Sequence, residues 1–138
     1  MKGFTSLEQS EKLKGILPPE SADMAYDWFI VGEKYSTIPQ CRKFIDDELP
    51  CWSLAALMNL LPSELTERGE YSETTYRIDI RKYALTDDVD IYQIAYGNYH
   101  WHEDGSCSWS DMINSGEKEE LIDAVFQMIC WLKENNKL

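Results

Sequence analysis

The sequence predicts an α+β fold, with a small, mainly antiparallel sheet of three to five strands packed against two or three helices. Residues 76–81 alternate apolar and polar side chains, as a strand with one buried face does. Two other segments, residues 50–61 and 121–132, are rich in aliphatic side chains at helical spacing. Turn signals between successive strand segments favour antiparallel pairing, so we expect the helical segments to cover the sheet.

A short first helix is expected before residue 18. Thr5 followed by Glu8 has the spacing of a capping box, and Pro18 stops the apolar stripe that follows. Residues 26–31 are then predicted to form a strand, because aromatic and β-branched side chains fill them. Residues 33–49 are predicted to form an exposed loop with room for one helical turn.

The helix over residues 50–61 is predicted to be central. Pro50 suits the first position of a helix, where no backbone N–H is needed, and Pro62 ends the apolar run. Apolar side chains cover most of its circumference, which indicates packing on more than one side. Residues 63–74, with regularly spaced glutamates, are expected to form a solvated connection.

The next segments predict two hairpins. Residues 89–96 are apolar on both faces and follow a turn at 86–88, so they are expected to pair with residues 76–81 and to be buried on both sides. Asp104-Gly105 predicts a hairpin turn between residues 99–102 and 106–109.

The last helix is expected to begin at Asn114 or Ser115, to hold glutamates in its first turn and to end on lysines, as the helix dipole favours. A fully buried Trp131 in this helix would make Trp131→Ala cost roughly 3–5 kcal/mol. The apolar side chains expected to face the core are Leu121, Ile122, Val125, Phe126, Met128, Ile129 and Leu132.

Length and composition predict a single domain over residues 1–138. A chain of 138 residues has no room for a second independent core. Hydrophobic residues make up 43% of it and aromatic residues 12%, too many for a disordered chain. No apolar signal-peptide core follows Met1, and the longest apolar stretch is about half a membrane span, so we expect a cytoplasmic protein.

The formal net charge of −12 narrows the class of partner. Such a charge repels phosphate backbones and anionic lipid surfaces, so we expect neither nucleic acid nor a membrane as partner. A basic protein partner would instead be attracted. The alternative is that acidity only keeps a small protein in solution.

The four cysteines are expected to be free, buried thiols. They form no C-x-x-C pair, which argues against a structural zinc site. A domain of this size needs no disulfide, although an even number would allow two. The four are Cys41, Cys51, Cys107 and Cys130.

Three segments carry a resemblance to a known family. They are residues 20–24 (Glu-Ser-Ala-Asp-Met), 50–57 (Pro-Cys-Trp-Ser-Leu-Ala-Ala-Leu) and 123–135, which includes a second Cys-Trp pair. On these residues the chain resembles an uncharacterised family of small proteins from gut Bacteroidales, a domain of unknown function. The resemblance implies a single compact domain. It implies no catalytic residue, because no activity is assigned to that family.

The first hypothesis about chemistry concerns Cys51, at an expected helix start. A thiol there gains thiolate character from the helix N-terminus. Cys-Trp before a helix of small residues is similar to the nucleophile segment of papain-like enzymes, with His100 or His102 following as the base. Asp47 and Glu48 stand where those enzymes have an oxyanion-binding segment, and their charge would oppose a thiolate. The alternative is a small core cysteine beside a packed tryptophan.

The second hypothesis concerns His100 and His102. Residues two apart on a strand face the same side, so both imidazoles would reach one metal ion, with Glu103 or Asp104 as a third ligand. A turn that swings Asp104 away would leave two ligands, too few for a tight zinc site. We therefore expect no stoichiometric metal and no cofactor, with both histidines exposed near a hairpin tip.

Aromatic side chains surround the two histidines. Tyr99, Trp101 and Trp109 are predicted either to form an exposed aromatic patch for a protein partner or to pack against a helix.

Together, these observations favour a non-enzymatic cytoplasmic protein that acts through an acidic surface on a protein partner, as an immunity-like, inhibitory or adaptor module. The reasons are the charge and the lack of a complete catalytic constellation. The competing hypothesis is a thiol-dependent hydrolase that uses Cys51 with His100 or His102.

Overall fold

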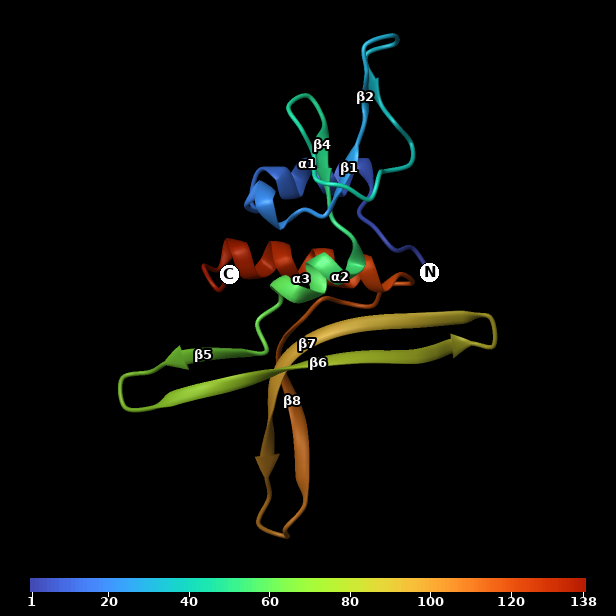
Figure 1. The fold of residues 1–138 in the computed structure, drawn as a ribbon. Helices are drawn as coiled ribbons and strands as arrows, with labels where there is room; N and C mark the ends of the chain where they lie inside the picture. Colours follow the sequence, from blue (N-terminus) through green and yellow to red (C-terminus); the bar gives the residue numbers. More distant parts are fainter.

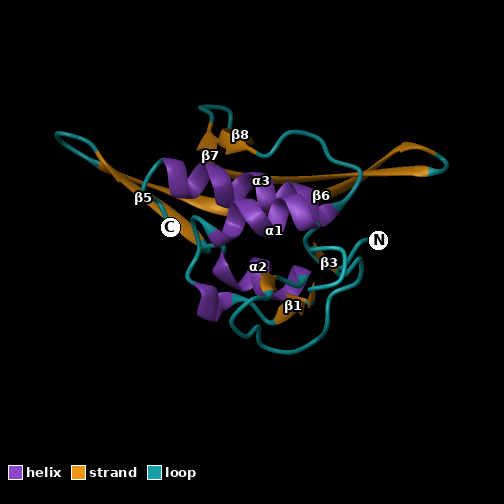
Figure 2. Ribbon diagram, turned by 90° about the horizontal axis from the view of Figure 1, so that it is seen from above, coloured by secondary structure: helices purple, strands orange, loops and turns teal.

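The computed structural model describes residues 1–138 and confirms the predicted α+β fold. Its α-helices are α1 (Leu7–Lys14), α2 (Leu54–Leu60) and α3 (Leu121–Glu134), with a short 3-10 turn, η1, at Pro19–Ser21. Figure 1 shows a long sheet, then α2 and α3 on one side of it, then α1 beyond them with the short strands β1 and β4. Seen from above, hairpins of the long sheet extend past the helices on either side (Figure 2).

The strands form three antiparallel sheets. β1 (Met24–Tyr26) pairs with β4 (Leu49–Cys51), and β2 (Trp28–Phe29) pairs with β3 (Lys34–Tyr35). The long sheet has the order β5-β6-β7-β8. Its strands are β5 (Glu64–Arg68), β6 (Glu73–Thr86), β7 (Val89–Trp101) and β8 (Cys107–Asn114).

The long sheet divides into separate hairpins. β6 pairs with β5 up to Arg77 and with β7 from Arg77 onward, while β7 pairs with β8 only from Ala95 to Trp101. The four strands therefore come together only near Arg77 and Gly97, and three hairpins leave that region in different directions (Figure 1). We call the hairpin formed by residues 98–110 the β7–β8 arm.

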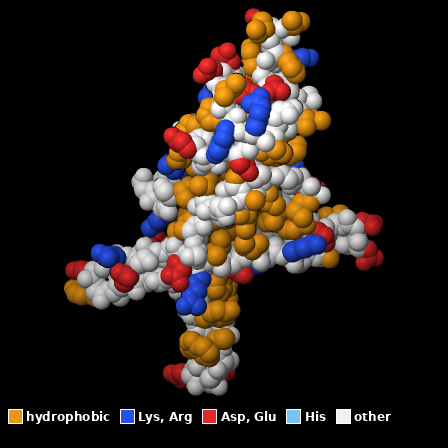
Figure 3. All heavy atoms as spheres, in the orientation of Figure 1, with side chains coloured by type: hydrophobic (Ala, Val, Ile, Leu, Met, Phe, Trp, Pro, Cys, Tyr) orange, Lys and Arg blue, Asp and Glu red, His pale blue; other side chains and the backbone are white.

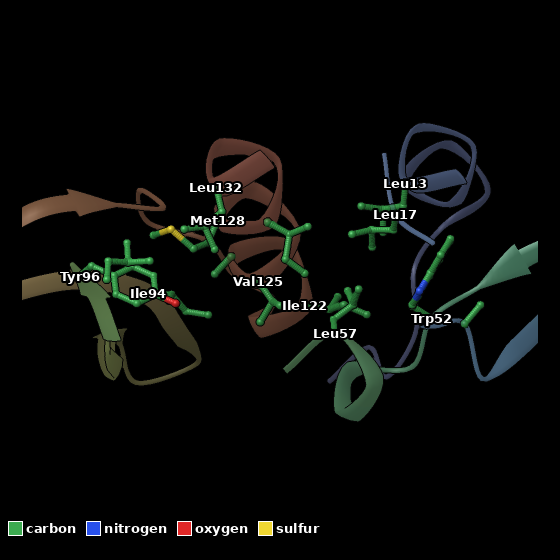
Figure 4. Close-up of a cluster of buried hydrophobic side chains, with 14 residues drawn as sticks. Leu13, Leu17, Trp52, Leu57, Ile94, Tyr96, Ile122, Val125, Met128 and Leu132 are labelled. Carbon is green, nitrogen blue, oxygen red and sulfur yellow. The ribbon is translucent and has the colours of Figure 1, made fainter. Parts of the chain in front are cut away.

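The main core surrounds α3. Its buried side chains come from α2, α3, β5, β7 and the N-terminal segment that includes α1, with Trp52 between β4 and α2. Figure 4 shows Ile94 and Tyr96 on one side of α3, and Leu13, Leu57 and Trp52 on the other. The predicted apolar face of α3 is confirmed, since five of the seven expected side chains are fully buried and the other two are partly buried. The buried five are Ile122, Val125, Met128, Ile129 and Leu132.

A second, smaller core lies where β1 meets β4. Met24, Tyr26, Leu49 and Cys51 are buried there together. The Tyr26 hydroxyl donates a hydrogen bond to the carbonyl oxygen of Thr5 at 2.7 Å, and burial raises the pKa of Tyr26 to about 12. This cluster anchors the base of the β2–β3 hairpin, which continues directly from β1.

α1 begins one residue later than predicted. Ser6 is the N-cap: its hydroxyl accepts from the Gln9 backbone N–H, and the Gln9 side chain accepts from the Ser6 N–H. Thr5 is buried, and its hydroxyl accepts from the backbone N–H of Trp52. Thr5 with Glu8 and Ser6 with Gln9 both have the spacing of a capping box. The prediction was wrong because it took the first pair, whereas the second forms the cap.

α2 begins after Ser53, so its predicted start at Pro50 was wrong. Pro50 lies in β4. The Ser53 hydroxyl accepts from the Ala56 N–H and donates to one carboxylate oxygen of Asp23, whose other oxygen accepts from the Ser53 N–H. This side-chain cap fixes the helix start. Leu57 is the one fully buried residue of α2, whereas α3 buries seven, so α3 is the central helix.

α3 begins at Leu121, so the predicted start at Asn114 or Ser115 was wrong. Asn114 ends β8, and the buried Ser115 hydroxyl accepts from the Ile94 N–H at 2.9 Å. Glu120 occupies the N-cap position. The two residues with suitable capping chemistry therefore serve the end of the sheet and the turn after it.

Three predicted segments differ from the structure. Residues 26–31 form no single strand, because β1 ends within them and the chain turns after β2, where Gly32 has a φ of 89°. Residues 33–49 contain β3 and the start of β4 but no helical turn. Residues 63–74 include β5 and the start of β6 where a solvated connection was expected. β1 to β5 each contain only two to five residues, too few for a long alternating pattern.

The remaining strand predictions are confirmed. Residues 76–81 lie in β6 and residues 89–96 in β7, which is buried on both faces over much of its length. The chain turns between β6 and β7 as expected. It also turns at Asp104-Gly105, where Gly105 has a φ of 84°.

Candidate functional site

Cys51 is an inaccessible thiol. It lies in β4, outside the helix that was predicted to activate it, and it is fully buried. Its Sγ lies 3.4 Å from the Thr5 hydroxyl and 3.6 Å from the Thr5 carbonyl oxygen. Burial raises the pKa of the Cys51 thiol, and the nearby Asp23 carboxylate raises it further. The thiol is therefore protonated and shielded from solvent.

The structure does not bring Cys51 together with either histidine. His100 lies in β7 and His102 directly follows it, on the β7–β8 arm. β4 and the free end of this arm lie at opposite ends of the molecule (Figure 1). No nucleophile–base pair is formed between them.

The structure also does not bring together the candidate metal ligands His100, His102, Glu103 and Asp104. The His102 imidazole lies 2.9 Å from the Ser108 hydroxyl. The Asp104 carboxylate accepts from the Ser106 N–H at 2.9 Å and from its hydroxyl at 2.5 Å, and these hydrogen bonds lower the pKa of Asp104. No group of three or more His, Cys, Asp or Glu side chains is placed to hold a metal ion.

The cysteines divide into two pairs. All four are free, as predicted, but only Cys51 and Cys130 are buried. Cys41 and Cys107 are exposed, so the expectation of four buried thiols was wrong for these two. Both lie on elements outside the core, in the loop before β4 and at the start of β8.

A cleft of about 470 Å³ lies beside the β2–β3 hairpin. One wall is the hairpin itself, and the other is the loop that precedes β4. Half of the lining side chains are apolar and half are acidic. The residues are Asp27, Trp28, Phe29 and Ile30 on the hairpin, and Ile45, Asp46, Asp47 and Glu48 on the loop.

The apolar wall is exposed and supported from one side. The Trp28 ring packs edge-on against Tyr35 of β3, with ring centroids 4.9 Å apart. Beyond it, Ile30 and Val31 at the turn are 84% and 90% exposed. Figure 3 shows hydrophobic side chains gathered at the end of this hairpin, with acidic side chains close by.

Arg42 ties the two walls together. Its guanidinium forms ion pairs with Asp27 on the hairpin, at 2.6 Å, and with Glu48 on the loop. The Glu48 carboxylate also accepts from the Ile45 N–H at 2.8 Å. The Arg42 hydrogen bond, helped by this N–H, lowers the pKa of Glu48 to about 2. The two walls of the cleft are thus linked by ion pairs.

Two acidic side chains of the cleft have no cationic partner. Asp46 and Asp47 are exposed and form no ion pair, whereas Asp27 and Glu48 are both neutralised in part by Arg42. The Asp46 and Asp47 carboxylates also line a neighbouring hollow of about 300 Å³, together with Trp28, Tyr35 and one cationic side chain, Lys14. In the cleft, carboxylates without an ion pair therefore lie beside exposed apolar side chains.

The structure is thus an α+β fold with an acidic, partly apolar cleft on its surface. No protein-family model matches the sequence, and no curated protein or solved structure matches it. Any assignment of function to this chain therefore depends on the geometry of the cleft itself.

The sequence contains both halves of the cleft without showing that they meet. The apolar run from Trp28 to Val31 before a glycine is a signal for an exposed turn of unusual hydrophobicity. The acidic cluster at Asp46, Asp47 and Glu48 is a signal for a solvated loop. Only the ion pairs of Arg42 show that one faces the other.

Proposed function

We propose that the chain is a non-enzymatic protein-binding module, of the immunity-like, inhibitory or adaptor kind, that holds a basic and partly apolar segment of a partner in the β2–β3 cleft. One observation carries this proposal: the cleft combines four apolar with four acidic side chains. Exposed apolar surface rimmed by polar groups is typical of protein-interaction sites.

The two kinds of side chain would act at different stages of binding. A net charge of −12 attracts a basic partner over long range and raises the association rate. The aromatic rings of Trp28 and Phe29 supply the contact area that holds a partner once it has arrived, since aromatic residues dominate interface energetics. Asp46 and Asp47 are free to pair with lysine or arginine side chains of the partner.

The same charge opposes nucleic acids and anionic lipid surfaces as partners. None of the helices has the length and apolar character that a membrane crossing requires. The proposal places the module in the cytoplasm, where four free cysteines stay reduced.

The competing thiol-dependent hydrolase has no comparable support. Its nucleophile, Cys51, is buried and protonated, and neither His100 nor His102 approaches it. The binding cleft needs no rearrangement to accept a segment from solvent, because its apolar wall is already exposed.

Two matched double variants test the proposal. Asp46→Asn with Asp47→Asn removes two unpaired charges from the cleft, and Asp87→Asn with Asp88→Asn removes two exposed charges from the β6–β7 turn. Each protein is immobilised and exposed to native lysate at several salt concentrations. We expect a stoichiometric, salt-sensitive partner that is lost with the cleft variant and kept with the turn variant.

The apolar contribution is tested in parallel. Ile30→Ser should also release the partner, because this side chain lines the cleft and is largely exposed. Retention of the same partner by the Asp46/Asp47 and Ile30 variants alike, at the level of the unmodified chain, would refute the cleft as the binding site.

A further inference from the structure

The β7–β8 arm presents an uncovered aromatic face. Tyr99 pairs with Trp109 across the two strands, and Trp101 pairs with Cys107. Cross-strand partners and alternate residues point to the same face of a sheet, so these four side chains share one face. Tyr99 is 59% exposed and Trp101 77% exposed. The opposite face carries the polar side chains Asn98, His100, Ser108 and Ser110.

The arm is amphipathic; the Trp109 ring packs over Gly97, but Tyr99 and Trp101 remain largely exposed. In an antiparallel sheet the apolar face normally covers a core. Here β7 leaves β6 at Gly97, and beyond it the arm is a lone two-stranded hairpin, a structure of marginal stability in water. Figure 3 shows hydrophobic side chains along this arm, away from the body of the molecule.

The chain exposes more solvent-accessible surface than a compact protein of the same mass does. A compact monomeric protein of 16.1 kDa exposes about 7,400 Å². This chain exposes 8716 Å². The excess of about 1,300 Å² is larger than the roughly 800 Å² that each partner buries in a standard interface. If a partner covered the exposed arm, the accessible surface of the chain would come closer to the value expected for its mass.

Charge decides which occupant suits the aromatic face. The only carboxylates between residues 98 and 110 are Glu103 and Asp104 at the tip, and the cationic Arg77 lines a hollow with Tyr99 and Trp109 at the base of the face. The Asp111 carboxylate, which accepts from the Trp109 indole, is ion-paired with Arg81. A basic partner would be attracted more strongly by the acidic cleft than by this face. Two copies of a chain with a net charge of −12 repel one another over most of their surface. The aromatic face is where that repulsion is least.

We propose that two copies of this chain associate through the aromatic faces of their β7–β8 arms, around a two-fold axis. Tyr99, Trp101 and Trp109 of each copy would pack against the same three side chains of the other, as an isologous interface requires. The exposed parts of three rings bury several hundred Å² per copy, at the low end for specific interfaces. The dimer is therefore weak, with a dissociation constant on the order of micromolar.

This inference is independent of the proposed function. The β2–β3 hairpin and the β7–β8 arm lie at opposite ends of the molecule, so a dimer leaves both clefts open (Figure 1). A partner segment and a second copy would be bound at the same time.

Sedimentation equilibrium between about 1 and 200 µM tests the dimer directly, because this range spans a micromolar dissociation constant. We expect the average mass to rise from one chain toward two. Trp101→Ser should keep the protein monomeric, with a dissociation constant at least about tenfold weaker. Leu85→Ser, another exposed apolar side chain on a different hairpin, should leave the dimer intact.

Cys107 gives a second readout that does not depend on a substitution in the rings. It lies on the aromatic face, so two copies would bring their Cys107 thiols near each other, whereas the other exposed cysteine, Cys41, lies elsewhere. A short bismaleimide should crosslink the dimer in the unmodified chain and in Cys41→Ser, but not in Cys107→Ser.

Three results would overturn the inference. One is a monomer at the highest concentration, and another is a dimer that persists in Trp101→Ser. The third is a crosslink that depends on Cys41. A dimer abolished by Ile30→Ser but not by Trp101→Ser would place self-association at the cleft and would contradict both proposals.

Discussion

The indole ring of Trp109 occupies the space that a side chain on Gly97 would need. A Cβ at Gly97 would lie 2.9 Å from two atoms of that ring, and it would also clash with the carbonyl oxygen of Ser110. Gly97 is the residue at which β7 leaves β6 for β8, and the register of β7 against β8 shifts there. A glycine therefore allows the close approach on which the β7–β8 arm depends.

Gly97→Ala should destabilise the protein by about 1–3 kcal/mol, because the added methyl group must displace backbone as well as the Trp109 ring. Urea unfolding measures the loss. Gly3→Ala is the matched control, since a Cβ there would meet nothing within 4 Å. Equal unfolding midpoints for the two variants would show that the arm does not pack over Gly97 as described.

Trp52 and not Trp131 should be the tryptophan on which stability depends most. Trp52 is fully buried, and its indole N–H donates to the Ser21 hydroxyl at 2.9 Å, whereas Trp131 is only partly buried. Trp52→Ala should cost about 3–5 kcal/mol. Trp131→Ala should cost about 1–2 kcal/mol. Thermal unfolding of both variants checks the order, and a larger loss for Trp131→Ala would contradict the packing of the main core.

The fold class was predictable because it follows from long, regular patterns of apolar and polar side chains. The alternation in residues 76–81 and the helical spacing of 121–132 each extend over enough residues to outweigh local ambiguity. Element starts were less predictable, since capping chemistry recurs along the chain. Ser53 is fixed as a cap by Asp23, which lies thirty residues away.

The candidate site was not predictable from local patterns. Its two walls, residues 27–30 and 45–48, are joined by Arg42, an exposed side chain with no distinguishing neighbours in the sequence. Cys51 shows the reverse case. Its position before an expected helix suggested activation, but pairing of β4 with β1 buries it instead.

Alkylation should separate the four cysteines into two classes. Iodoacetamide at neutral pH should label Cys41 and Cys107 quickly in the folded protein, because both are exposed. Cys51 and Cys130 should label only in denaturant, since burial shields each thiol and raises its pKa. Mass spectrometry of digested protein assigns each site. Rapid labelling of Cys51 in the folded state would instead support the hydrolase hypothesis.

Low pH should weaken the ion pair between Arg42 and Glu48, which links the two walls of the cleft. The folded pKa of Glu48 is about 2, below its ordinary value of 4.5, so its contribution to stability is present above 4.5 and is lost as the pH falls toward 2. The difference in unfolding free energy between the unmodified chain and Glu48→Gln should therefore shrink over that range. Glu70→Gln, at an exposed carboxylate with no ion pair, is the control. A difference that is constant with pH would show that the Arg42 pair does not form.

The most direct test of the binding cleft follows the five tryptophan indole N–H signals in a ¹⁵N–¹H correlation spectrum. The probe is a synthetic peptide of alternating lysine and leucine, and the control replaces each lysine with glutamate. We expect the lysine peptide to shift the Trp28 signal, leave those of Trp52 and Trp109 in place, and lose its effect in the Asp46→Asn, Asp47→Asn variant. A Trp28 signal that stays fixed while Trp101 or Trp109 moves, or an equal response to the glutamate peptide, would contradict the account.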